Sequence, residues 1–163
     1  MPNADADDAG RRTRLAIAIV VVVVALDQAT KAWAVAELAS GPVSIIGNVE
    51  LHLSRNGGGA FSLFRGFTPL LAILAVVIAV VLIRAARRAQ DPLTLVTLAL
   101  VLGGALGNLS DRMFRAPSFL SGRVVDFVRV GSFPTFNVAD SAITIGAVVL
   151  VAASLRPSRR AAS

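Results

Sequence analysis

Four long apolar stretches constrain the fold of this 163-residue chain more than any other feature. A helix needs about 20 predominantly apolar residues to cross a bilayer, and 55% of the chain is hydrophobic while only 16% is charged. We expect spans from about Arg14 to Glu37, from about Thr68 to Ile83, from Pro92 to about Met113, and from about Asn137 to Leu155. The sequence therefore predicts an all-α membrane fold with four transmembrane helices.

The positions of the basic residues predict how the helices cross the membrane. The net charge is +6, but the basic residues stand at the ends of apolar stretches and not among exposed aromatic residues, so they do not indicate a nucleic-acid partner. Nine of the sixteen lie before the first span, between the second and third spans, or after the fourth: Arg11, Arg12, Arg14, Arg84, Arg87, Arg88, Arg156, Arg159 and Arg160. Cytoplasmic segments carry the excess of Arg and Lys, so both termini are expected in the cytoplasm.

The segments outside the spans complete the expected organisation around a membrane domain of residues 14–155. Residues 1–13 are rich in aspartate and predict a disordered cytoplasmic tail, and residues 156–163 form a basic cytoplasmic tail. Residues 38–67 and 114–136 would then lie on the outer side. Apolar residues alternate from Val43 to Leu53, and glycines punctuate this segment, which predicts a small extracytoplasmic β element packed on the helix ends. Residues 114–136 are expected to form an outer loop.

Polar residues within the spans gather at one depth. They are Asp27, Lys31, Asn108, Asp111, Arg112, Asn137 and Asp140, all towards the outer side. Asp27 lies roughly 18 Å along its helix from Leu15, which is beyond the middle of a hydrocarbon core about 30 Å thick. The inner halves of the spans are almost wholly apolar. A channel or proton pathway needs polar groups through the whole depth, so this pattern favours a shallow site near the outer surface.

Several of these polar residues also have plain structural interpretations. Asp27 and Lys31 stand four residues apart on one helix face and are equally well explained as a buried ion pair. Asn137 is a suitable N-cap and Asp140 would then occupy the third helical position, where a carboxylate is favoured. Gly103, Gly104 and Gly107 are explained by close helix packing.

Asp126 is harder to explain structurally, although it could be an ordinary strand or loop residue. It stands among Val124, Val125, Phe127 and Val128, where an unpaired carboxylate would lose water and its pKa would rise. Two aspartates in a partly dry site share a proton, which supplies an acid and a base in one unit. The chain has no cysteine and a single histidine, His52, which is better explained as a partly buried strand residue than as a metal ligand. No metal and no cofactor are therefore expected.

Five ordered motifs give the chain a resemblance to a known family. They are Asp27-Gln28-Ala29-Thr30-Lys31, Asn56-Gly57-Gly58-Gly59-Ala60-Phe61-Ser62, Gly104-Ala105-Leu106-Gly107-Asn108 with Asp111-Arg112, Val125-Asp126-Phe127, and Phe136-Asn137-Val138-Ala139-Asp140. The chain resembles the lipoprotein signal peptidase family, also called signal peptidase II, from about Arg14 to Leu155.

The resemblance implies a function and a role for each motif residue. It implies a bacterial inner-membrane aspartic endopeptidase that removes the signal peptide from diacylglyceryl-modified prolipoproteins, with membrane lipid around it and its active site on the extracytoplasmic side. We expect the protein to be a monomer. Asp126 and Asp140 would be the catalytic pair. Asn56, Asn108, Arg112 and Asn137 would line the pocket, and Asp27, Lys31 and Asp111 would support them. Residues 38–67 would form a β-cradle with a lid-like loop.

Two other functions compete with this interpretation. The intramembrane charges would also suit a small ion-coupled or proton-coupled transporter, although the apolar inner halves oppose it. Alternatively, all of the charges could be structural pairs in a membrane scaffold without enzymatic activity.

Overall fold

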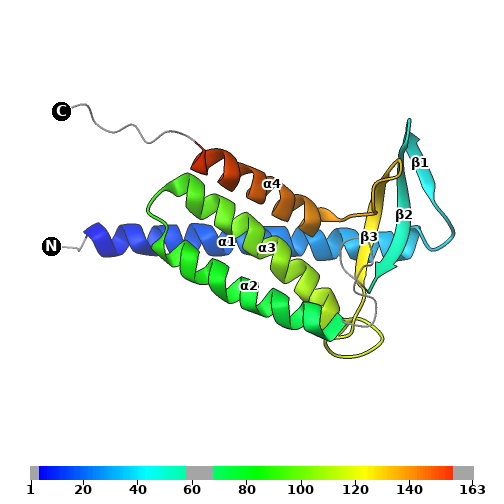
Figure 1. Cartoon of the computed structure of the whole chain (residues 1–163), viewed down its shortest axis with the longest axis horizontal. Coiled ribbons are helices and arrows are strands. Elements are labelled where there is room, and N and C mark those ends of the chain that lie inside the picture. The colour runs from blue at the N-terminus through cyan, green and yellow to red at the C-terminus, as the bar shows by residue number, and fades with distance from the viewer. Residues whose placement is uncertain (1–3, 58–67, 156–163) are drawn as a thin grey trace.

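The computed structural model describes residues 4–57 and 68–155, which form a helical bundle with a small sheet at one end (Figure 1). The elements in chain order are α1 (Ala4–Glu37), β1 (Val43–Ile46), β2 (Val49–Asn56), α2 (Thr68–Arg88), α3 (Pro92–Phe114), β3 (Val124–Val130) and α4 (Val138–Ser154). The start of α1, the connection from α2 to α3 and the end of α4 lie at the end of the bundle away from the sheet (Figure 1).

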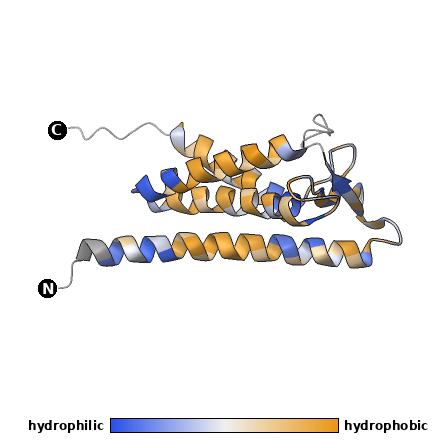
Figure 2. Ribbon diagram, turned by 90° about the horizontal axis from the view of Figure 1, so that it is seen from below, coloured by the Kyte–Doolittle hydropathy of each residue, from blue (hydrophilic) through white to orange (hydrophobic). Residues whose placement is uncertain are grey.

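The first helix begins earlier than the sequence analysis expected. α1 starts at Ala4, whereas a tail was predicted up to residue 13. Its first turns combine alanine, a strong helix former, with Asp7 and Asp8, whose negative charges are favourable near a helix N-terminus. Arg11 also pairs with Asp8 at 3.1 Å. These local contributions extend the membrane helix into a polar first section, visible as the hydrophilic end of α1 (Figure 2).

The helices are apolar enough for a membrane. Among the described residues, three reach the length and hydropathy of a span, namely Asp7–Glu37 of α1, α2 and α3, while α4 is apolar but has 17 residues. Large apolar side chains of α2, such as Leu70, Ile73 and Val77, are exposed. This exposure is unfavourable in water and favourable against lipid tails, so the chain is a multi-pass membrane protein.

Helix α3 is the centre of the bundle, because α1, α2 and α4 all pack against it. Two of its glycines permit this approach. A Cβ atom at Gly104 would collide with the Ala139 carbonyl oxygen of α4, and one at Gly107 would lie 2.6 Å from an Asp27 carboxylate oxygen of α1. The packing explanation predicted for these glycines is therefore confirmed, and it brings the polar residues of three helices together.

The sheet is antiparallel with the order β1-β2-β3. The strands β1 and β2 confirm the predicted β element. The residues of β3 were expected to belong to a loop, and this expectation was wrong. The strand lacks the alternation of apolar and polar residues that a half-exposed strand shows, because four consecutive residues are buried: Val124, Val125, Asp126 and Phe127. Phe127 packs on Ala34 and Leu38 at the end of α1, which fixes the sheet on the bundle.

Two features of the sheet place β3 beside the start of α4. Asp126 of β3 pairs with Ser54 of β2, two residues before Asn56. The backbone of Phe136 also exchanges hydrogen bonds of 2.9 Å with Val128, so the residue before Asn137 is attached to β3.

Of the glycine-rich motif that begins at Asn56, residues 58–62 lie outside the described part of the chain, as does most of the expected lid-like loop.

Candidate active site

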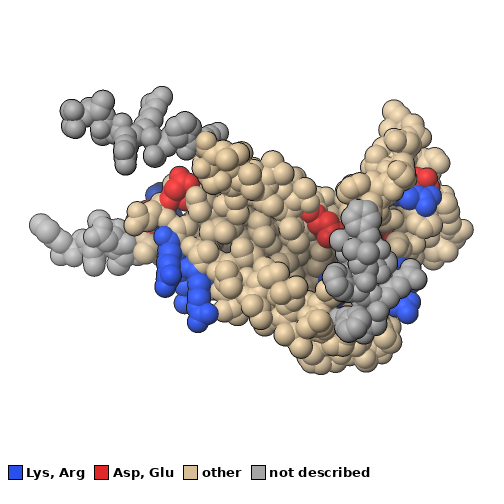
Figure 3. Space-filling model, viewed as in Figure 1, with Lys and Arg blue, Asp and Glu red and all other residues tan. Residues whose placement is uncertain are grey.

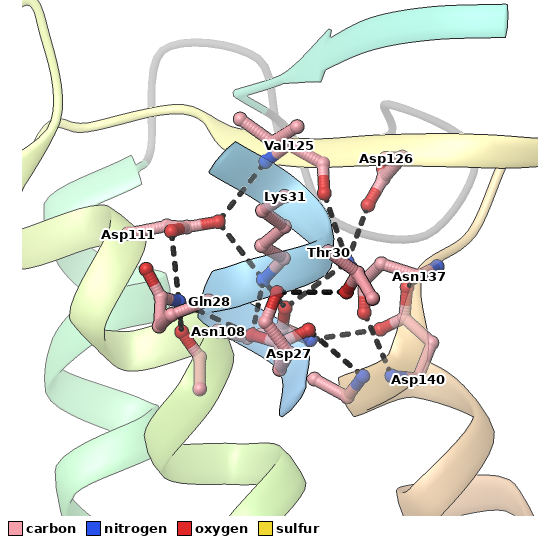
Figure 4. A network of polar contacts seen from close by, with 12 residues as sticks. Asp27, Gln28, Thr30, Lys31, Asn108, Asp111, Val125, Asp126, Asn137 and Asp140 are labelled. Carbon is pink, nitrogen blue, oxygen red and sulfur yellow. Dashed lines mark hydrogen bonds and ion pairs between the residues drawn. The ribbon is translucent and has the colours of Figure 1, made fainter. Parts of the chain in front are cut away.

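A fully buried cation lies at the centre of the polar cluster. The Lys31 ammonium of α1 lies 2.8 Å from an Asp27 oxygen and 2.9 Å from an Asp111 oxygen of α3, and all three side chains have no exposed surface. Lys31 also donates a hydrogen bond of 3.0 Å to the side-chain oxygen of Asn108. The predicted Asp27–Lys31 pair is therefore present, but it belongs to a larger network that joins α1 to α3 (Figure 4).

The two carboxylates of this network also bind the backbone of the other elements. Asp27 accepts a hydrogen bond of 3.0 Å from the backbone N–H of Ala139, in the first turn of α4. Asp111 accepts one of 3.0 Å from the backbone N–H of Val125, next to Asp126 on β3. Each carboxylate therefore positions one of the two segments that carry the candidate catalytic aspartates.

Two further members of the network were not singled out from the sequence. Gln28 donates hydrogen bonds to Asp27, Asp111 and the Gly107 carbonyl, over 3.1 to 3.2 Å. Arg115, the C-cap residue that follows α3, pairs with Asp111 at 2.6 Å. The signals were present, because Gln28 lies inside the first motif and Arg115 follows Asp111 by four residues.

Asn137 is the residue that connects the two candidate catalytic aspartates. Its backbone N–H donates to Asp140 over 3.2 Å, and the Asp140 backbone N–H donates to the Asn137 side-chain oxygen over 2.9 Å, so the two form a capping box at the start of α4. The side-chain N–H of Asn137 also donates to Asp126 over 2.6 Å. The predicted helix cap is present, and Asn137 donates from its backbone to the Asp140 carboxylate and from its side chain to the Asp126 carboxylate.

Asp126 has the properties of a carboxyl group that holds a proton near neutral pH. Its side chain is 3% exposed. Burial and the nearby Asp140 carboxylate raise its pKa from 3.8 to about 7, against the opposing effects of hydrogen bonds from Asn56 and Asn137. Asn56, at the end of β2, is thus brought to the site as the sequence predicted.

Asn108 and Arg112 complete the site from α3. Asn108 donates a hydrogen bond of 2.8 Å to Asp140 and accepts one of 3.2 Å from Asn137. One terminal N–H group of Arg112 donates to the Asn108 carbonyl over 3.2 Å, while its buried Nε has no hydrogen-bond partner among the described residues. Arg112 therefore lines the cavity beside the aspartates as a half-buried cation.

The two aspartates line a cavity of about 550 Å³. Its polar lining includes Asn56, Asn108, Arg112 and Ser141, and its apolar lining includes Val124, Phe133, Phe136 and Ile145. Acidic side-chain atoms reach the surface where the bundle meets the sheet, on an otherwise largely uncharged face (Figure 3). A cavity with one apolar wall and a few converging polar groups is typical of a small binding or catalytic site.

Residues suited to hold a metal are not grouped in the described part of the chain. No group of three or more His, Asp or Glu residues has the geometry of a metal site there. His52 is half-buried on β2, as expected, and is not one of the residues that line the cavity. The polar groups that line the cavity are carboxyl groups, amides, hydroxyls and a guanidinium.

Comparison with known proteins agrees with the motifs. The family model described as "Signal peptidase (SPase) II" matches residues 19–156. The "Lipoprotein signal peptidase" of Rhodococcus jostii (strain RHA1) is 50% identical over 147 residues, which are 89% of this chain and 74% of the relative. The protein of the same name from Mycobacterium tuberculosis (strain ATCC 25618 / H37Rv) is 47% identical over 156 residues, which are 94% of this chain and 76% of the relative.

Two solved structures share the fold. Both are described as a bacterial membrane enzyme, one at 1.9 Å and one at 2.3 Å resolution, and both are 31% identical to this chain. The first covers 88% of this chain and 94% of its own with a TM-score of 0.74, and the second covers 86% and 87% with a TM-score of 0.75. With its motifs, its membrane fold and these relatives taken together, the chain belongs to the signal peptidase II family of lipoprotein signal peptidases.

Proposed function

We propose that this protein is an aspartic endopeptidase that cleaves the signal peptide from diacylglyceryl-modified prolipoproteins, with Asp126 and Asp140 as its catalytic pair. Membership of the lipoprotein signal peptidases supports a peptidase that acts on lipoprotein signal peptides. The observation that carries the aspartic mechanism is that both carboxyl groups line one cavity and are bound to the same residue, Asn137.

The hydrogen bonds suggest which aspartate holds the shared proton. Both oxygens of Asp140 accept N–H groups, one from Asn108 and one from the Asn137 backbone, and an acceptor-only carboxylate suits that arrangement. The pKa of Asp126 is raised to about 7, so this group retains a proton near neutral pH. We therefore assign the proton to Asp126 and the negative charge to Asp140.

The reaction follows from this assignment. Asp140 takes a proton from a water molecule, the water oxygen bonds to the peptide carbonyl carbon, and Asp126 donates its proton to the carbonyl oxygen. As the tetrahedral intermediate collapses, that oxygen returns its proton to Asp126, the C–N bond breaks, and the proton held by Asp140 passes to the leaving amine. Arg112 lines the same cavity, so its guanidinium is placed to donate to the substrate backbone or to the oxygen that gains charge.

The cavity also suits a substrate held in the membrane. Phe133, Phe136 and Ile145 give it an apolar wall beside the two aspartates. A diacylglyceryl group anchored in the leaflet would keep the adjoining peptide bond at the depth of the site, so the reacting groups meet at a high effective concentration.

A cleavage assay with the purified protein tests this function. We expect a diacylglyceryl-modified prolipoprotein to be cut and the same precursor without the lipid to remain intact. A chelator should leave the rate unchanged, since paired carboxyl groups need no metal to activate water. Loss of activity on chelation that a specific divalent ion restores would contradict the mechanism.

The proton on Asp126 predicts a pH dependence. Deprotonation of Asp126, whose pKa is about 7, removes the group that polarises the carbonyl. The cleavage rate should therefore fall as the pH rises above 7, approaching about ten-fold per pH unit. A rate measured in detergent that stays constant up to about pH 9 would contradict the assignment of the proton.

The arrangement in the membrane is a separate prediction. We propose four spans, with both termini cytoplasmic and the aspartates on the extracytoplasmic side of the bacterial inner membrane. Reporters fused after Gln90 and at the C-terminus should read cytoplasmic, and reporters inserted near Gly58 and Ser121 should read external. An external reading after Gln90 would overturn the four-span arrangement.

A further inference from the structure

A second cavity lies at the end of the bundle away from the aspartates. Its volume is about 440 Å³, and its lining comes from α1, α2 and α3. Helices α1 and α2 each pack extensively on α3 but not on each other, so the space between them is a groove with α3 as its floor. Ile17 and Val21 of α1, Ile83 of α2, and Leu95, Ala99 and Leu102 of α3 make it apolar.

Two arginines line the same groove. Arg12 of α1 donates a hydrogen bond to the Gln90 carbonyl, which fixes its guanidinium at the connection between α2 and α3. Arg87 stands opposite on the last turn of α2 and is exposed. Neither arginine forms a salt bridge with a carboxylate whose side chain the structure describes. Asp91, the carboxylate near Arg12, is held by the backbone N–H of Thr94 at 2.8 Å.

The lining determines what could occupy this groove. Its apolar part faces the hydrocarbon region, where an acyl chain can fill a space that protein side chains leave open. The guanidinium groups at one end provide forked N–H donors that match a phosphate group. Basic pockets between transmembrane helices at a membrane surface bind anionic lipid headgroups in this way.

We propose that this groove binds one anionic phospholipid of the leaflet opposite the aspartates, with an acyl chain between α1 and α2 and the phosphate held by Arg12 and Arg87. The lipid would fix the distance between α1 and α2, which contact each other little. This site depends on the membrane setting of the protein and not on its proposed peptidase activity.

Native mass spectrometry of the intact protein in a non-ionic detergent tests the proposal. Phosphatidylglycerol should bind one molecule per chain, more tightly than phosphatidylcholine with the same acyl chains. Since each basic residue contributes about a five-fold gain for an anionic lipid, Arg87→Gln should weaken phosphatidylglycerol about five-fold and Arg12→Gln with Arg87→Gln roughly 25-fold. Arg84→Gln and Arg88→Gln are matched controls, because they remove the same charge from the same helix but do not line the groove.

A second measurement separates a lipid from a free anion and from a misfolded variant. Phosphatidylglycerol should raise the melting temperature of the wild type and of the two control variants, and should raise that of Arg87→Gln less. Inorganic phosphate should neither raise it nor displace the lipid. Equal affinity for the two lipids, an equal loss of affinity in the control variants, or displacement by inorganic phosphate would each overturn the proposal.

Discussion

Replacement of Asp126 by asparagine should reduce cleavage of the lipidated precursor by about 10³-fold or more, because asparagine keeps the shape of the side chain but cannot share or donate the proton. The same variant should not be less stable. The raised pKa, about 7 against an ordinary 3.8, means that ionisation of Asp126 opposes folding. The Asp126 carboxyl group therefore makes its full contribution to the free energy of unfolding below about pH 4, and this contribution is lost as the pH rises through about 7.

Measuring the stability of Asp126→Asn therefore shows whether its loss of activity could come from misfolding. Melting in detergent at about pH 8 should show the variant equal to or above the wild type, and the difference should shrink as the pH falls towards 4. Asp140→Asn should lose activity to a similar extent but should also lose stability. Both Asp140 oxygens accept N–H groups, so an amide nitrogen in place of one oxygen leaves a partly buried donor facing another donor, at a cost of about 1 kcal/mol.

Removal of the buried cation should have the largest effect on stability. Lys31→Met leaves Asp27 and Asp111 without the ammonium that lies within 3 Å of both, in a site with no exposed surface. Breaking a buried ion pair by removing one partner typically costs about 3–5 kcal/mol. We expect a large drop in the melting temperature of the purified protein, together with a loss of activity, since these carboxylates also hold Ala139 and Val125.

A double variant shows whether Lys31→Met loses stability because it leaves unpaired charges or because it loses side-chain packing. Asp27→Asn combined with Lys31→Met removes one charge of each sign and leaves Asp111 with Arg115, at 2.6 Å. It should therefore recover much of the stability that Lys31→Met loses. A single Lys31→Met variant as stable as the wild type would contradict the structural role of the network.

Part of the clustering of polar residues could be predicted from the sequence. Polar residues are costly inside a membrane, so the common depth of Asp27, Asn108 and Asp140 already indicates that they meet. Local rules also predict the capping box at Asn137. They cannot predict that Asn137 additionally binds Asp126, because this contact depends on how β3 is joined to the residue before α4.

The start of α1, the strand β3 and the groove between α1 and α2 were not predicted from the sequence, each for a physical reason. The aspartates near the N-terminus resemble a disordered tail by composition, yet with alanine they extend α1 to Ala4. The strand β3 lacks alternation, since Val124 to Phe127 are buried by the sheet and by the helix ends together. The sequence pattern gives no sign of the groove with Arg12 and Arg87, because the groove depends on α1 and α2 packing on α3 rather than on each other.

The most direct test of the paired aspartates is the turnover of lipidated precursor by Asp126→Asn, Asp140→Asn and the double variant, measured side by side in the same detergent. Residues that act as one catalytic unit have effects that do not add. We predict that the double variant is no slower than either single variant, with all of them near the uncatalysed rate. Substantial turnover by either single variant, or losses that multiply in the double variant, would contradict a catalytic pair.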